Sequence, residues 1–140
     1  MTREINIEVF FDFICPWCMI GKRQLQVAIE KLRYSHPDVI VKLQWNGVQL
    51  LPHIPVDGIP FNAFYLQRLG SMTAVRMRQA LVREAAKAVS IDLDFDRIPR
   101  MPNTAKAHSF YANANKICDA AQSDRLLEGL YSAYFHHSEN

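Results

Sequence analysis

The sequence contains few cysteines and glycines, three and five among 140 residues, and it has no marked excess of charge of either sign. Its 16 basic and 14 acidic residues leave a net charge of +2, so we expect no nucleic-acid partner and no membrane surface. No apolar run approaches the roughly 20 residues of a membrane span, and residues 1–5 lack the apolar core of a signal peptide. We therefore expect a cytoplasmic protein, and its 49% apolar content is enough for a buried core.

A strand pattern followed by a helix pattern opens the chain. Apolar residues alternate over residues 5–13, and the partly apolar second face predicts that this strand lies inside the domain. From Cys18 to Leu32 apolar residues recur at helical spacing. A second strand is predicted over residues 39–45, so the segment forms a β-α-β unit with parallel strands.

Two of the three cysteines form the motif Cys15-Pro16-Trp17-Cys18 where the first strand meets the helix. Pro16 suits the first helical position, which places Cys15 at the helix start among unpaired backbone N–H groups. These groups stabilise a thiolate and lower its pKa, so Cys15 is the predicted nucleophile. Cys18, three residues later on the same face, is the predicted resolving cysteine. The alternatives are two inert core thiols or a structural zinc half-site, which lacks a second pair of ligands.

Residues next to the motif have two interpretations each. Asp12, at the end of the strand, either carries a proton for Cys18 or caps the helix. Trp17 is expected to be exposed and to form an apolar wall of a substrate groove, whereas a histidine there would stabilise the thiolate more strongly. Cys118 lies on an apolar stripe of a predicted helix, which favours a small core residue over a redox role.

The rest of the chain is predicted to be helical. Three prolines and a glycine indicate an irregular linker over residues 51–60, and residues 91–102 are expected to form a loop with a turn at residues 94–96. The predicted helices cover residues 60–70, residues 73–89, a segment that starts at Asn103 or Thr104, and a last segment capped by Ser123. We expect three parts: residues 1–50 as the β-α-β unit, residues 51–60 as the linker and residues 61–140 as a helical insert.

Several segments resemble one known family. Residues 12–18 with Gly21 are similar to the active-site segment of the DsbA-like thioredoxin-fold oxidoreductases, in particular the FrnE-like branch. Asn103-Thr104 with Ala107-His108, and Ala133-Tyr134-Phe135, resemble segments of that family's helical insert. The branch also includes the 2-hydroxychromene-2-carboxylate isomerases, which typically carry serine at the position of Cys15, and this difference favours the redox members.

The resemblance implies an α/β fold, with a thioredoxin-like β-α-β unit and an inserted all-helical bundle. Family members continue with a cis-proline loop, a β-hairpin and a last helix, which have no counterpart after Asn140. We therefore expect a shortened chain without the C-terminal part of the thioredoxin fold. The resemblance also brings His108 towards the active-site cleft, with a surface or capping position as the alternative.

The leading hypothesis is a thiol–disulfide oxidoreductase that acts on protein or small-molecule thiols and disulfides. Such an enzyme requires no organic cofactor, and glutathione is a candidate co-substrate. One alternative is a non-catalytic binding or holding module, because the second wall of the cleft is expected to be absent. Another is a glutathione-dependent isomerase or transferase of the same superfamily. An open sheet edge would also allow two copies to pair as a homodimer.

Overall fold

The computed structural model describes residues 1–139. Its longer strands and the first helix are β1 (Arg3–Phe11), α1 (Pro16–Ser35) and β2 (Val39–Gly47). They are followed by β3 (Ile59–Pro60), α2 (Phe61–Leu69), α3 (Met72–Lys87), the 3₁₀ helix η1 (Phe95–Arg97), β4 (Arg100–Met101), α4 (Ala105–Asn115) and α5 (Ala120–Phe135).

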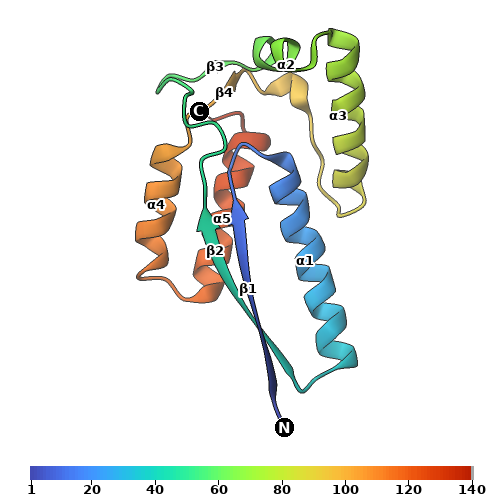
Figure 1. Cartoon of the computed structure of the whole chain (residues 1–140), viewed down its shortest axis with the longest axis vertical. Helices are drawn as coiled ribbons and strands as arrows, with labels where there is room; N and C mark the ends of the chain where they lie inside the picture. The colour runs from blue at the N-terminus through green and yellow to red at the C-terminus, as the bar shows by residue number, and fades with distance from the viewer. Residues whose placement is uncertain (140) are drawn as a thin grey trace.

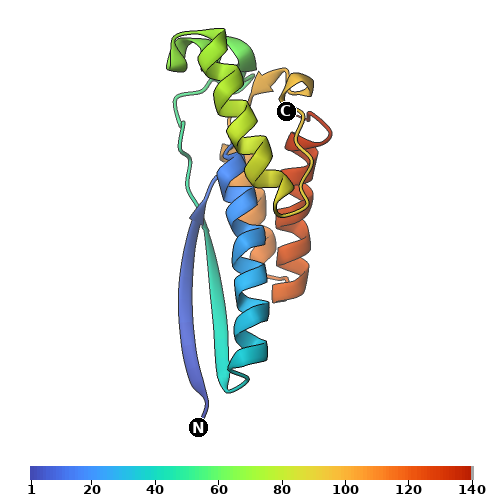
Figure 2. The same cartoon turned by 90° about the vertical axis from the view of Figure 1, so that its right-hand side faces the viewer.

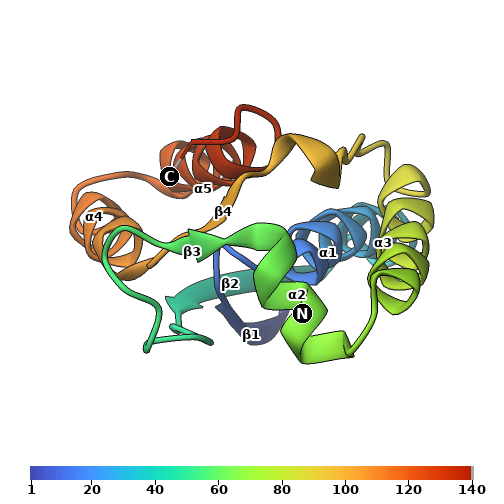
Figure 3. The ribbon, with the colours of Figure 1, turned by 90° about the horizontal axis from the view of Figure 1, so that it is seen from above.

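The β-α-β unit predicted from the sequence is confirmed. β1 and β2 pair in parallel, with Arg3 opposite Val39 and Phe11 opposite Gly47. α1 forms the crossover between them, and together with α4 and α5 it lies on one side of this sheet (Figures 2 and 3). α2 and α3 lie beyond the carboxyl end of β1, and α3 packs beside α1 (Figure 1). The mixed α/β fold class is therefore as predicted.

The prediction that β1 is buried inside the domain is wrong. Phe11 is the only fully buried residue of β1, and the side chain of Phe10 is 63% exposed. Within residues 1–139 this sheet has two strands, and helices cover only one of its faces. The apolar residues of the second face therefore do not reach a core.

Short elements also replace parts of two expected loops. Ile59 and Pro60 pair antiparallel with Met101 and Arg100, so the linker ends in a strand, β3, and the second loop ends in β4. The turn predicted at residues 94–96 is confirmed, because the Asp94 carboxylate accepts a hydrogen bond from the backbone of Asp96 at 3.1 Å.

The last helix begins earlier than predicted. Asp119, not Ser123, caps α5, and it forms a capping box with Gln122: each side chain accepts a hydrogen bond from the other residue's backbone N–H. The Ser123 hydroxyl instead donates to Asn115 at 2.6 Å. Because α4 already ends at Asn115, Cys118 lies in the connection between α4 and α5 and not on a helical stripe.

One hydrophobic core joins the two ends of the chain. Phe11 and Phe13 near the sheet, Ile20 of α1, and Leu127 and Tyr131 of α5 belong to the same buried cluster. None of the described helices has both the length and the apolar character needed to cross a membrane. The division at residues 51–60 stays a prediction, since the core extends across it.

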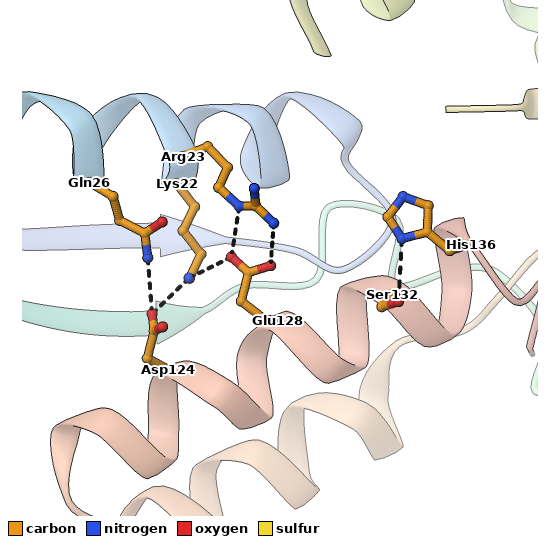
Figure 4. A network of polar contacts seen from close by, with 7 residues as sticks. All are labelled: Lys22, Arg23, Gln26, Asp124, Glu128, Ser132 and His136. Atoms are coloured by element: carbon orange, nitrogen blue, oxygen red, sulfur yellow. Dashed lines mark hydrogen bonds and ion pairs between the residues drawn. The ribbon is translucent and has the colours of Figure 1, made fainter. Parts of the chain in front are cut away.

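A buried lysine also connects α1 to α5 (Figure 4). The Lys22 side chain is fully buried, and its Nζ lies 2.7 Å from a carboxylate oxygen of Asp124 and 2.7 Å from one of Glu128. Arg23 also contacts Glu128, at 3.4 Å. Burial opposes ionisation of Glu128, but the hydrogen bonds from Lys22 and Arg23 outweigh it and lower the pKa of Glu128. The network therefore holds the two helices together through charge.

We predict that Lys22→Met destabilises the fold by about 1–3 kcal/mol, because two carboxylates would then face each other without a cation. The cost is below that of a fully buried pair because Asp124 and Glu128 are partly exposed. The Glu128 pKa is lower in the folded than in the unfolded chain. The contribution of Glu128 is therefore complete above about pH 4.5 and is lost as the pH falls through the folded value.

Urea unfolding of the original chain and of the Lys22→Met variant, at pH 7 and at pH 3.5, measures this loss of folding stability and its dependence on pH. The matched control is Lys42→Met, whose partner Glu4 at 2.8 Å is exposed, and we expect a change within about 0.5 kcal/mol. Equal losses in the two variants would contradict the assigned role of Lys22.

Candidate active site

The Cys-x-x-Cys motif lies where the sequence placed it, at the start of α1. Cys15 is the N-cap residue with extended backbone angles, and Pro16 is the first residue of the helix. The Cys15 N–H donates to the Asp12 carbonyl at 3.4 Å, and the Cys18 N–H donates to the Cys15 carbonyl at 3.1 Å. Both cysteines are free thiols and partly buried. The strand, the tight turn and the helix start thus fix the two sulfur atoms on the same turn.

The two thiols have opposite electrostatic environments. The Cys18 thiol donates a hydrogen bond to the Cys15 sulfur, and the backbone N–H groups of Cys18 and Trp17 donate to the same sulfur. These donors outweigh burial and the Asp12 charge, and they lower the pKa of Cys15 to about 7. The same bond, together with burial, raises the pKa of Cys18. At neutral pH Cys15 is therefore partly thiolate while Cys18 holds its proton.

Asp12 is completely buried behind the motif. Its Oδ1 accepts hydrogen bonds from the Phe13 N–H at 2.7 Å and from His108 Nε2 at 2.9 Å, and its Oδ2 accepts from the Leu50 N–H at 2.8 Å. Burial opposes ionisation, but these hydrogen bonds and one from Thr104 outweigh it and lower the pKa of Asp12. The carboxylate makes no capping bond to α1, so that alternative is wrong.

His108 of α4 contacts this carboxylate although it lies 96 residues away along the chain. Its ring lies 4.8 Å from the Phe13 ring and 5.6 Å from the Phe11 ring, measured between centroids. Its Nδ1 atom is buried and has no hydrogen-bond partner among the described residues. Nδ1 faces Gly47, where a Cβ atom would overlap it. Gly47 therefore provides the space that lets His108 approach Asp12.

A cavity of about 340 Å³ opens beside Cys15. Trp17 lines it and is 46% exposed, as expected for an accessible turn. The opposite wall comes from α2 and α3, with Phe64, Tyr65 and two arginines. A second cavity of about 450 Å³, between α4 and α5, contains neither cysteine of the motif. The hollow beside Cys15 is therefore the one that gives access to the motif.

Comparison with known proteins gives the family. The profile of the DSBA-like thioredoxin domain matches residues 6–140. The chain belongs to this family. Its fold is also similar to the crystal structure of a probable DsbA oxidoreductase from Streptomyces coelicolor, with a TM-score of 0.82 and 20% sequence identity. That match covers 96% of this chain and 56% of the other, so the chain spans little more than half of its length.

No curated protein matches the chain. At 20% identity, the structural likeness shows the DsbA-like fold and nothing further about chemistry. The residues that the sequence singled out are nevertheless gathered at one place. Asp12 and His108 are in contact next to Cys15, Pro16, Trp17 and Cys18.

Cys118 is separate from this DsbA-like site, because it lies in the connection between α4 and α5, at the ends of these helices that point away from α2 (Figure 1), and it does not line the cavity beside Cys15. Sequence reasoning missed Tyr65, Arg68 and Arg78, which line the cavity. They lie more than forty residues from the motif, and no local pattern in the sequence relates them to it. Within residues 1–139, no group of three acidic, histidine or cysteine side chains is arranged to hold a metal ion.

We predict that Gly47→Ala displaces His108 from Asp12 and costs about 1–3 kcal/mol of folding stability, the usual penalty for an unpaired buried group. Gly129→Ala is the matched control. It lies in the middle of α5 with open space around it, and we expect it to stabilise the chain by up to about 1 kcal/mol.

A double-mutant cycle measured by urea unfolding assigns the cost to His108. In a His108→Ala background the added methyl group no longer meets the ring, so Gly47→Ala should cost much less than in the original chain. Equal costs in the two backgrounds would show that His108 is not the residue displaced.

Proposed function

We propose that the chain is a thiol–disulfide oxidoreductase that uses Cys15 as nucleophile and Cys18 as resolving cysteine. The observation that carries the proposal is the geometry of the motif: Cys15 is the N-cap of α1 beside an open cavity, and Cys18 follows on the same turn. The lowered pKa of Cys15 and the raised pKa of Cys18 support it. A reactive thiol needs a thiolate fraction at ambient pH, and its partner must stay protonated until the second step. The open cavity beside Cys15 supports the same assignment.

The reaction proceeds by two exchanges. The Cys15 thiolate attacks one sulfur of a substrate disulfide, forming a mixed disulfide and releasing the other substrate sulfur as a thiolate. Cys18 then loses its proton and attacks the Cys15 sulfur, which releases the second substrate thiol and leaves a Cys15–Cys18 disulfide. The substrate gains two electrons and two protons, and the dithiol loses them. Run in reverse, the same steps oxidise a substrate dithiol.

We assign Asp12 as the group that accepts the Cys18 proton. Its carboxylate is buried, and its charge is among the causes that raise the pKa of Cys18, which places it within electrostatic reach of that thiol. An ionised carboxylate behind the resolving thiol attracts the proton when Cys18 must become a thiolate. His108 is a positioning residue in this scheme, because it acts on Asp12 and not on the substrate.

Placement in the FrnE-like branch is part of the same proposal. It is supported by Cys15 in place of the serine of the isomerases, and by the position of His108 from the Asn-Thr…Ala-His segment beside the motif. The substrates are protein or small-molecule thiols and disulfides, and the chemistry requires no organic cofactor. Glutathione is a candidate co-substrate. A cytoplasmic location and a homodimer stay predictions.

We predict that the iodoacetamide alkylation rate of Cys15 in the reduced chain rises with a midpoint near pH 7, because only the thiolate reacts. Cys18 should stay unreactive through the same range, since its pKa is raised. Mass spectrometry of peptides quenched between pH 5 and pH 9 measures both rates at once. A Cys15 midpoint at about 8.5, that of a free cysteine, would contradict the assembled site.

Substitution of the cysteines tests the order of the two steps. Cys15→Ser should abolish reduction of a disulfide substrate such as insulin, whereas Cys18→Ser should accumulate a mixed disulfide on Cys15 that mass spectrometry detects. Cys118→Ser is the matched control and should keep the original rate. Turnover that persists in the Cys15 variant would overturn the proposal and favour a binding module.

A further inference from the structure

The cavity beside Cys15 has an uneven charge. Twelve residues line it, and among them Arg68 and Arg78 are charged while no acidic residue contributes. Arg68 comes from α2 and Arg78 from α3, so both approach from the wall that faces the motif. The remaining lining is mainly apolar and aromatic, including Trp17 and Phe64. A ligand that fits this hollow therefore meets an apolar floor and two cations.

Neither guanidinium is neutralised by a group within the described part of the chain. Among residues 1–139, neither Arg68 nor Arg78 forms an ion pair or a hydrogen bond with another side chain or with the backbone. The contact that Arg68 does make is with the Phe64 ring, 5.9 Å from the ring centroid. This stacking fixes the guanidinium at the edge of the cavity and leaves its N–H groups for a ligand.

Tyr65 places a third polar group in the same space. Its hydroxyl has no hydrogen-bond partner among the described residues, although its ring packs on Phe61 and Phe64. Burial raises the pKa of Tyr65 and Cys15 adds to the effect, whereas Arg68 and Arg78 act against it. All three groups therefore lie close enough to Tyr65 to influence its hydroxyl, which ties the cations to the reactive sulfur.

From this arrangement we propose that the cavity selects disulfides that carry a carboxylate close to the sulfur attacked by Cys15. Arg68 and Arg78 bind the carboxylate, Tyr65 donates a hydrogen bond to it, and the apolar floor receives the adjoining chain. This inference rests on the proposed redox function and adds the charge of the substrate to it. The exchange itself is unchanged: the Cys15–substrate disulfide forms as the leaving thiolate departs.

The test compares three small disulfides of different charge on the reduced 140-residue chain. The probes are 3,3′-dithiodipropionate, 2-hydroxyethyl disulfide and cystamine, which are an anion, a neutral molecule and a cation at pH 7. The rate of chain oxidation is followed at low salt by acid quenching and mass spectrometry. Each probe is compared with itself across variants, so differences in intrinsic reactivity cancel. Dividing by the neutral probe removes any change in the Cys15 thiolate fraction.

We expect Arg68→Gln and Arg78→Gln each to lower the anion-to-neutral rate ratio by about two- to fivefold, the range for partly exposed charge pairs. The cation-to-neutral ratio should rise in the same variants, and added salt should reduce both effects. Arg76→Gln is the matched control. It removes the same charge from α3, but Arg76 does not line the cavity and lies on the other side of the helix, two residues from Arg78.

Unchanged ratios in both cavity variants, or an equal fall in the Arg76 variant, would overturn the charge preference. Failure of the original chain to react with the neutral probe would instead overturn the redox function, so the two failures are distinguishable. A further arm compares glutathione disulfide with the disulfide dimer of a blocked Glu-Cys-Gly peptide. If Arg68→Gln and Arg78→Gln lower the oxidation rate with glutathione disulfide only, the site is specific for small disulfides. If they lower the rate with both disulfides, the site also accepts disulfides of protein chains.

Discussion

The buried Asp12 carboxylate is the constraint on which the site depends. A buried charge without partners is strongly destabilising, and here three segments supply them: the motif loop through Phe13, the segment after β2 through Leu50, and α4 through His108. The main-chain oxygen of the same residue accepts hydrogen bonds from Cys15 and from the hydroxyl of Tyr131 on α5. The residue whose charge affects the thiols therefore also joins the parts of the chain that surround them.

The position of Asp12 disfavours the thiolate form of both cysteines, but only Cys15 has interactions that offset this effect. The negative charge of Asp12 raises the pKa of both Cys15 and Cys18. Cys15 stands at the N-cap, where N–H groups without helical partners stabilise its thiolate and more than offset that charge. Cys18, the third residue of α1, donates its thiol proton to the Cys15 sulfur, and this hydrogen bond together with burial raises its pKa. The N-cap position of Cys15 and the hydrogen bond that it accepts from the Cys18 thiol thus give two chemically identical residues different pKa values.

The sequence predicted what local pattern determines. The strand, the turn and Pro16 at the first helical position place residues 15–18 correctly because all the forces involved act within a few residues. The approach of His108 came from family resemblance alone, since a contact across 96 positions leaves no local pattern. The burial of Lys22 likewise has no local signal, because the two carboxylates that cover it come from α5, about a hundred residues later in the chain. Ser123 was a reasonable cap by residue type, but Asp119 forms the reciprocal pair.

Arg68 and Arg78 show why the rest of the site was beyond reach of the sequence. Each lies on the exposed surface of a helix, and among residues 1–139 neither has an ion-pair or hydrogen-bond partner. From the sequence alone, each resembles an ordinary solvated arginine. Their meaning depends on where α2 and α3 pack, which is opposite Cys15 and on the open side of the motif. Asp12, with its negative charge, is buried behind the thiols and does not line the cavity. The charged groups of the cavity are the two arginines, which come from the helices after the linker. The β-α-β unit therefore carries the Cys-x-x-Cys motif, and the helices after the linker carry the two arginines on the other wall of the cavity.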